Sequence, residues 1–496
     1  MTMRGGPLAG LASALFAVTL ICEPAQAALP SAFGPEVKVG EGQGGYVGAL
    51  NVLPDHGKAG APFTVTAEKL PPNQEFQLIW QTVNGSWNVA DAQYKGREYV
   101  PVAYQMGRVR SDAQGRINAR FTTPEDFGFG HDILLQQGNR LMNQVGYSID
   151  MSVDITPKSG PLGTPIKVEV KGIGWRSLYN SWDLLYDNHF TGWMSAVTTH
   201  GSASFTIPAT GHVGDHILQV MHGALTFPYQ NPEQNPAPGR PRFELPFTVT
   251  AGVPVLPPAP QAQAQRNVRV LPPQGELVSA PRFSGVGEPV KVSSTGLTAG
   301  KTYKLNWTRV IGNRMTGQGW EEASTPVAEA KADASGRAEF AFNTPDDLGG
   351  THGLWIDMGG NKKKVGSHLI KSTALPVAVT KGPVGTKFTL HLKGVGWTET
   401  ANIMHVVYDN AYNGYVCAFN SQGDVEIFVS ATGAPGWHFI DLYPGIYKGT
   451  ESDPILNNFR IPQLTFAADH PGEDLPAFRF AFEVTAGGAV KQAQAN

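Results

Sequence analysis

The chain of 496 residues is long enough for three or four domains of the usual size of about 100–200 residues. Its 58 glycines and 38 prolines form nearly a fifth of the chain, and only 16% of the residues are charged. This composition favours many short strands joined by tight turns, and therefore an all-β fold. A formal net charge of −3 without a dense Lys/Arg cluster argues against a nucleic-acid partner, and no cofactor signature is present.

Residues 1–27 have the features of an export signal: one basic residue, a short apolar run and an end rich in small residues. We expect cleavage after Ala27, and the apolar run is shorter than the ~20 residues that span a bilayer. A lipoprotein site at Cys22 is the alternative, but Ile21 precedes it where such sites need a small side chain. Once the signal is removed, Cys417 is the only cysteine, so no intrachain disulfide can form.

The first repeat, domain A1, follows a lead-in segment at 28–47 and covers 48–153. The stretch Phe76–Trp80 is predicted to form a strand, and Asp112–Arg116 is predicted to be a hairpin turn. A segment with the sequence TPEDFG, Thr123–Gly128, then leads into the next predicted strand.

The second repeat, domain B1, covers 154–252. It opens with a proline- and glycine-rich turn at Pro157–Thr164, continues with a strand at Ile166–Val170 and reaches the Gly-x-Gly of Lys171–Trp175. This order resembles the IPT/TIG family of immunoglobulin-like domains, and the resemblance recurs in the fourth repeat from Lys381. It implies an immunoglobulin-like β-sandwich and specifies no function.

The second half of the chain repeats the first after a Pro/Ala/Gln-rich linker at 253–270. Domain A2, 271–376, repeats A1, and domain B2, 377–487, repeats B1. A short tail at 488–496 is expected to be disordered. The predicted architecture is therefore four immunoglobulin-like β-sandwiches in two tandem A–B pairs.

Each repeat contains a histidine that follows a glycine-containing turn and alternates with two apolar residues. Because strand side chains alternate in direction, each histidine shares the core-facing side with its apolar neighbours. We interpret these histidines as packed, hydrogen-bonded residues at strand starts. The four groups are His131 with Ile133 and Leu135, His216 with Leu218 and Val220, His352 with Leu354 and Ile356, and His438 with Ile440 and Leu442.

A nucleophile triad is the catalytic hypothesis for the B domains, since Ser or Cys with His and Asp is the chemistry of acyl transfer. Three observations argue against it. The equivalent histidines of the A domains occur in repeats without a Tyr-Asp-Asn element, the cysteine lies in an apolar alternation, and the serine lacks a Gly-x-Ser-x-Gly turn. The weak candidates are Asp187, Ser195 and His216 in B1, and Asp409, Cys417 and His438 in B2.

A metal site is a second hypothesis, because B1 is rich in histidine and imidazoles suit zinc or copper. No spacing matches a compact ligand motif, and B2 keeps one of the five histidines, so we predict no metal site. The histidines are His189, His200, His212, His216 and His222.

The Tyr-Asp-Asn element occurs only in the B domains. Asp and Asn tolerate left-handed turns, so the element is at least a loop between two strands. With nearby aromatic residues it also suits sugar or peptide binding, or docking between neighbouring domains. The predicted binding residues are Tyr186, Asp187, Asn188, Trp193, Tyr408, Asp409, Asn410, Tyr412 and Tyr415.

Both B domains also have a long loop before the final strand, at Thr226–Pro236 and Gly449–Pro476, which either binds a ligand or covers a neighbouring domain. We expect an exported, non-catalytic binding or scaffolding protein, periplasmic or on the cell surface, that contacts a partner protein or polysaccharide through B-domain loops. The alternative is an accessory subunit or hydrolase-type enzyme with a site in a B domain or at an A–B junction.

Overall fold

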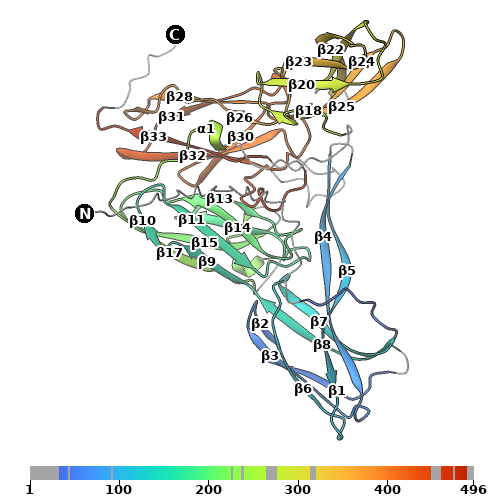
Figure 1. Ribbon diagram of the computed structural model, residues 1–496. Coiled ribbons are helices and arrows are strands. Elements are labelled where there is room, and N and C mark those ends of the chain that lie inside the picture. Colours follow the sequence, from blue (N-terminus) through green and yellow to red (C-terminus); the bar gives the residue numbers. More distant parts are fainter. Residues whose placement is uncertain are drawn as a thin grey trace, which may run out of the picture.

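The computed structural model describes residues 33–42, 45–90, 93–224, 227–235, 239–263, 276–312, 320–447, 460–472 and 475–488. The predicted export signal, the linker beyond residue 263 and the predicted tail after residue 488 lie outside these residues. Strands dominate the described chain, as the composition predicts (Figure 1).

The first A–B pair consists of two sandwiches, each with a three-stranded sheet and a larger sheet, which has five strands in A1 and six in B1. In A1 the three-stranded sheet has the order β1 (Ala49–Leu53), β3 (Pro62–Glu68), β6 (Ile117–Thr122), and the five-stranded sheet β2 (His56–Lys58), β8 (Arg140–Asp150), β7 (Phe129–Gln137), β4 (Glu75–Ala90), β5 (Gln93–Arg110). In B1 the orders are β14 (Ala203–Pro208), β11 (Pro165–Lys171), β9 (Ser152–Thr156) and β10 (Ser159–Gly160), β17 (Phe243–Val249), β15 (Gly214–Ala224), β12 (Trp182–Tyr186), β13 (His189–Met194), with β16 (Phe227–Pro228) beside β15 and a 3-10 turn η1 (Pro232–Gln234).

The second pair repeats these sheets in the same order. In A2 they are β18 (Ser279–Ala280), β20 (Pro289–Ser294), β23 (Ala338–Asn343) and β19 (Phe283–Ser284), β25 (Lys362–Ile370), β24 (Gly350–Asp357), β21 (Thr302–Gly312), β22 (Trp320–Lys331). In B2 they are β26 (Thr373–Ala374), β28 (Lys387–Lys393), β31 (Val425–Ser430) and β27 (Lys381–Gly382), β33 (Phe478–Val484), β32 (Gly436–Pro444), β29 (Ile403–Tyr408), β30 (Ala411–Cys417), with a 3-10 turn η2 (Phe419–Ser421). The predicted all-β fold of four sandwiches in two A–B pairs is confirmed.

The alternation of apolar and polar residues places the core of each sandwich. In β33 every second side chain, from Phe478 to Val484, is buried, and the residues between them are half-buried. In β28 the same alternation buries Phe388, Leu390 and Leu392. Burial of a side chain of this size stabilises the fold by roughly 1.5–3 kcal/mol. Each of the four sandwiches has an apolar core of such residues.

The TPEDFG segment of the first half forms the joint between A1 and B1. Its Asp126 is buried and accepts a 2.8 Å hydrogen bond from Trp80 Nε1 of the A1 core, and Gly128 N donates to Ile173 O of B1. The second half repeats this joint, with a 3.0 Å bond from Trp307 Nε1 to Asp347. The A–B pair is therefore a duplicated structural unit as well as a duplicated sequence.

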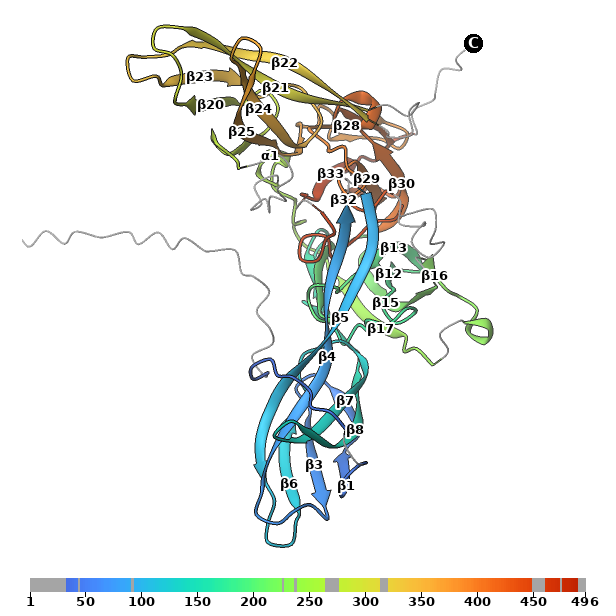
Figure 2. The same ribbon diagram turned by 90° about the vertical axis from the view of Figure 1, so that its right-hand side faces the viewer.

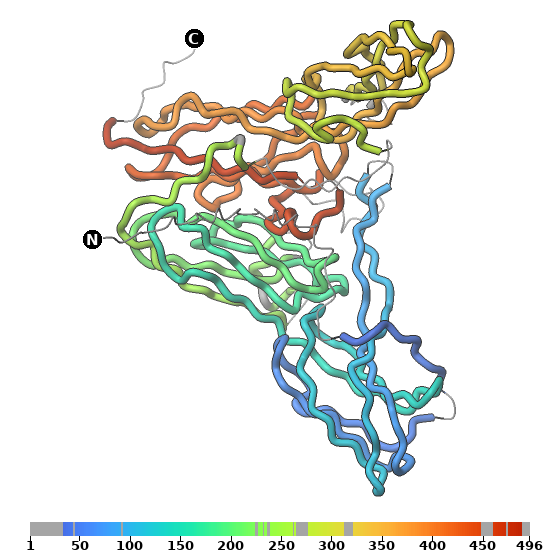
Figure 3. Tube along the Cα trace, in the orientation of Figure 1, coloured from blue at the N-terminus to red at the C-terminus, as the bar shows by residue number. Residues whose placement is uncertain are grey.

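The two halves are arranged so that B1 and B2 lie side by side, with A1 and A2 at opposite ends (Figures 1 and 2). The hairpin of β4 and β5 is much longer than the body of A1 and runs past B1 to B2 (Figure 2). The chain leaving B1 crosses to B2 (Figure 3). This crossing contains a short helix, α1 (Pro260–Gln263), and the Gln263 side chain bonds to the backbone of Arg479.

Candidate functional site

Each Tyr-Asp-Asn element forms a two-residue hairpin turn. Asp187 and Asn188 have φ angles of 48° and 68°, and Asp409 and Asn410 have 47° and 62°. These left-handed conformations are the ones that Asp and Asn tolerate, as the sequence predicts, and they match the twist of a tight hairpin. The turns connect β12 to β13 and β29 to β30.

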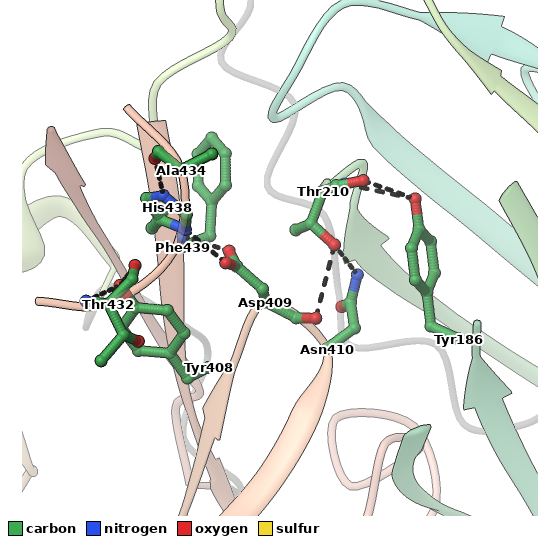
Figure 4. Close-up of polar contacts among 9 residues, drawn as sticks. All are labelled: Tyr186, Thr210, Tyr408, Asp409, Asn410, Thr432, Ala434, His438 and Phe439. Atoms are coloured by element: carbon green, nitrogen blue, oxygen red, sulfur yellow. Dashed lines mark hydrogen bonds and ion pairs between the residues drawn. The ribbon is translucent and has the colours of Figure 1, made fainter. Parts of the chain in front are cut away.

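The aspartate of each turn pairs with the strand-start histidine of the same domain. The distance from His216 Nδ1 to Asp187 Oδ2 is 2.5 Å, and His438 and Asp409 repeat it at 2.5 Å (Figure 4). Burial lowers the pKa of His438, but the hydrogen bond and charge of Asp409 outweigh this, so its pKa lies above the ordinary value.

The histidines are also held by a contact common to all four domains. The Nε2 atom of each lies 2.6–2.8 Å from the carbonyl oxygen four residues earlier. In the A domains, which have no Tyr-Asp-Asn turn, His131 and His352 stack on Trp80 and Trp307. These contacts support the structural interpretation of the histidines.

The structure does not bring a nucleophile to either Asp–His pair. Ser195 follows the end of β13 that pairs with Trp182, whereas Asp187 lies at the turn at the other end of this hairpin. Five residues of strand separate the two ends, which corresponds to about 15 Å. In B2, Cys417 pairs with Ile403 at the equivalent far end.

The two turns have different surroundings. Asn410 of B2 is buried against B1, where its Nδ2 atom lies 2.9 Å from Pro208 O and 3.0 Å from Thr210 Oγ1 (Figure 4). Thr191 Oγ1 of B1 donates to Asn410 O at 2.6 Å. The equivalent Asn188 is exposed and bonds to Gln219 of its own domain. The B2 turn is therefore a docking element between the B domains.

Other predicted binding residues also lie at this interface. Trp193 is fully buried, and Tyr412 packs edge-on against Phe190 at 6.1 Å. Docking between domains is thus a role that these loops perform within the chain. Asn188 and Tyr415 are the predicted binding residues that are exposed. The tyrosine before each turn donates a 2.9 Å hydrogen bond to a carbonyl oxygen of its own domain, Tyr186 to Thr210 O and Tyr408 to Thr432 O.

A single buried carboxylate joins three domains. Asp469, in the long loop of B2, is 1% exposed and accepts hydrogen bonds from Val197 N at 2.8 Å and Thr198 N at 2.9 Å, both in B1. Its Oδ1 atom also accepts a 2.9 Å bond from Trp87 Nε1 of the A1 hairpin. The Asp469 carbonyl accepts a bond from Ser195 Oγ at 3.3 Å. Ser195 therefore belongs to this interdomain joint.

The tip of the A1 hairpin fills the space between the B domains. Tyr94 packs with Trp193 of B1 and with Ile446 and Ile461 of B2. The Arg97 guanidinium lies over the Trp193 ring at 5.3 Å, a cation–π contact. The hairpin thus acts as a strut that fixes A1 to both B domains.

The long loop of B2 covers B1 as an added edge segment. Trp193 N donates to Pro462 O and Leu464 N donates to Trp193 O, both at 2.9 Å. The approach requires Gly192, where a Cβ atom would lie 2.7 Å from Pro462 O. Residues 448–459 and 473–474 of this loop lie outside the described residues.

Two buried ionisable residues occupy equivalent positions in the B domains. Both Asp183 carboxylate oxygens lack a hydrogen-bond partner among the described residues, and burial raises the pKa of this group well above its ordinary value. In B2 the position is held by His405, whose pKa burial lowers to about 3. Both side chains are therefore disposed to be neutral in the folded protein.

Among the histidines of the metal hypothesis, His212 and His216 are neighbours, with ring centroids 4.8 Å apart. His200 contacts Asp126 at the A1–B1 joint, and His222 bonds to the backbone of Leu178. His189 and His212 are exposed. Within the described ranges no group of three or more His, Cys, Asp or Glu side chains could hold a metal ion.

A cleft of about 460 Å³ lies where B1, the linker and B2 meet. Ser204 and Thr206 of B1 line it on one side, and Leu256 belongs to the linker wall. Its B2 lining includes Asp441 and Arg479, whose ion pair is 2.5 Å long. The remaining lining includes the apolar residues Phe205, Leu464, Phe466, Leu475 and Phe478. Pattern analysis misses this site because its walls come from three separate segments.

No family model and no curated protein matches the chain. Solved structures resemble its fold at low identity, among them an ICAM-5 D1–D4 ectodomain fragment (9% identity, 84% of this chain and 99% of that chain, TM-score 0.17). The bacterial integrin-binding protein invasin is another, at 10% identity over 84% of this chain and 79% of that chain, with a TM-score of 0.18. A third is the Bacteroides ovatus glucan-utilization protein SGBP-B, solved with a mixed-linkage heptasaccharide. It is 11% identical over 67% of this chain and 70% of that chain, with a TM-score of 0.15. At these identities and TM-scores the similarities carry no argument about the function of this chain.

In the described part of the chain, no helix has the length and apolar character needed to cross a membrane.

We expect Asp469→Ala to loosen the contact between the three domains. The change leaves the buried amide of Val197 and the half-buried Thr198 amide and Trp87 indole without their acceptor, at a cost of about 1–3 kcal/mol for each buried donor. Amide hydrogen exchange at Val197 and Thr198 should accelerate at least about 100-fold. Asp132→Ala, at an exposed position in A1, is the control, and unchanged exchange in Asp469→Ala would contradict the role of the joint.

The buried His405 predicts acid sensitivity. Because its folded-state pKa of about 3 lies below 6.5, the unfolded chain binds a proton first, so stability falls as pH drops below 6.5. Protonation of this group in the unfolded chain should lower the free energy of unfolding by about 2 kcal/mol between pH 6.5 and 5. His405→Phe should remove that share in thermal unfolding at the two pH values, whereas His212→Phe, at an exposed position, should not. An equal loss of stability between the two pH values in His405→Phe and in the wild type would refute the prediction.

Proposed function

We propose that the protein is an exported, non-catalytic binding or scaffolding protein that contacts a protein or polysaccharide of the cell envelope through its B domains. The observation that carries this proposal is the cleft between B1, the linker and B2, which combines apolar walls with a few polar groups. Its volume of about 460 Å³ lies in the usual range of ligand sites. Export is supported by the signal-like sequence of residues 1–27.

The rigid mounting of the cleft supports a binding role. Its walls belong to domains that the A1 strut, the Asp469 joint and the Asn410 turn hold together. A preformed site avoids the entropic cost of ordering its walls when a partner binds. The polar-aromatic turns, which sequence analysis proposes as binding loops, contribute to this mounting, and exposed Asn188 and Tyr415 are available for further contacts.

The proposal is tested by capturing envelope components on the immobilised full chain. Ser204→Trp places a bulky side chain at an exposed position of the cleft lining without altering a core residue. We expect a captured polysaccharide or protein to bind this variant at least about tenfold more weakly than the wild type. Ser430→Trp, at an exposed position that is not part of the cleft lining, is the matched control.

Equal binding by Ser204→Trp and the wild type would show that the partner does not use the cleft. Failure of the wild type to retain any envelope protein or polysaccharide would remove the basis of the proposed function.

A further inference from the structure

Resting on the proposed function, we propose that the cleft binds a neutral, polyhydroxylated ligand of the size of one or two sugar residues. The recognition groups are Asp441, Tyr443 and Gln463 of B2. All three side chains line the cleft and are more than nine-tenths buried, with exposed fractions of 2%, 6% and 0%.

Asp441 and Tyr443 lie on the same side of β32, because they are two residues apart in a strand. Asp441 Oδ1 is paired with Arg479, but its Oδ2 atom and the Tyr443 hydroxyl make no hydrogen bond of ordinary geometry with any described residue. The two groups are nevertheless close, since burial and then the charge of Asp441 raise the pKa of Tyr443. The phenol is close enough to interact with the Asp441 carboxylate and the Arg479 guanidinium. Beyond these contacts, the carboxylate and phenol oxygens in the cleft lining retain hydrogen-bonding capacity that no well-formed bond fills.

Gln463 adds a second acceptor. Its Nε2 atom donates to Ser195 Oγ at 3.0 Å and to Asp469 O at 2.7 Å, so the interdomain joint orients the amide. The buried Oε1 atom has no partner among the described residues. A buried acceptor without a hydrogen bond costs about 1–3 kcal/mol, which a ligand with suitable donors offsets.

The arrangement discriminates between chemical classes of ligand. A ligand hydroxyl can donate to the Asp441 carboxylate and accept from the Tyr443 phenol once the phenol proton turns from Asp441 to the ligand, whereas an ammonium group has no lone pair to accept. An anionic ligand would place its negative oxygens against the acceptors of Asp441 and Gln463. The charges of Asp441 and Arg479 compensate each other, so the lining carries no net charge from these two residues. The apolar walls suit the C–H face of a sugar ring.

The recognition groups are specific to the second half of the chain. In B1 the strand positions equivalent to Asp441 and Tyr443, 222 residues earlier (441−219, 443−221), are Gln219 and Met221. The cross-strand partner of Gln219 is Glu244, whereas that of Asp441 is Arg479. The duplicated fold does not require these residues, so they are features of the B2 side of the cleft.

The test is calorimetric titration of the full chain with glucose, galactose, mannose and N-acetylglucosamine, and with gluconate and glucosamine as charged analogues. At least one neutral sugar should bind, and the anionic gluconate should bind at least about tenfold more weakly. Tyr443→Phe should weaken binding of that sugar about tenfold by removing one hydroxyl. Tyr46→Phe, at an exposed tyrosine of the first half outside the cleft lining, should leave affinity within about twofold.

The outcomes separate this proposal from the proposed function. If an envelope partner is captured and Ser204→Trp blocks it, but no neutral sugar binds or Tyr443→Phe binds as the wild type does, the function stands and the sugar proposal is refuted. If nothing is captured and no sugar binds, both fail. Thermal unfolding of Tyr443→Phe checks that this variant is folded. If Tyr443→Phe unfolds early, loss of sugar binding in Ser204→Trp gives independent support for the proposal.

Discussion

The buried carboxylate of Asp469 is the interaction on which the arrangement of the domains depends. It accepts hydrogen bonds from the hairpin of A1 and from the backbone of B1, while its own backbone belongs to B2. A buried carboxylate is stable only when its hydrogen-bonding capacity is filled. The donors come from two other domains, so the charge is accommodated only when all three domains are in place. The joint therefore couples the solvation of one side chain to the docking of A1, B1 and B2.

Duplication has produced two equal A–B units that meet unequally. Both A–B joints use a buried aspartate bonded to a core tryptophan, and both B domains use the same left-handed turn. At the B1–B2 contact, however, the turn with Asn410 inserts into B1, while the turn with Asn188 faces solvent. The bulge residue Thr191 and the close approach at Gly192 give B1 a surface that accepts the B2 turn and loop.

The position of the cleft follows from this unequal contact. Its walls come from B1, the linker and B2, so it exists only while the two B domains are docked. Gln463 belongs both to the joint, through Ser195 and Asp469, and to the cleft lining. Loosening the joint should therefore also disturb the orientation of a cleft acceptor. The cleft lining and the docking of the domains are physically linked through this side chain.

Local patterns in the sequence determined the strands, the turns and the duplication. Alternating apolar residues bury one face of a strand wherever that strand lies, and Asp-Asn pairs adopt left-handed turns for reasons within two residues. The packed histidines were predictable for the same reason, because each shares its face with neighbouring apolar side chains. The all-β class thus followed from periodicity and composition, whereas the immunoglobulin-like sandwich was implied by the resemblance to IPT/TIG domains.

Tertiary structure alone decided which residues meet across domains. Trp87 and Asp469 are separated by 382 positions, and Ser195 and Asp469 by 274, so no local spacing indicates either contact. The sequence suggested Ser195, Asp187 and His216 as a possible triad. In the structure Ser195 lies at the end of the β12–β13 hairpin opposite to the Asp187 turn, where it bonds to B2. The cleft was unpredictable for the same reason, since its lining is defined by the docking of separate segments, and a sequence pattern records only what neighbouring residues share.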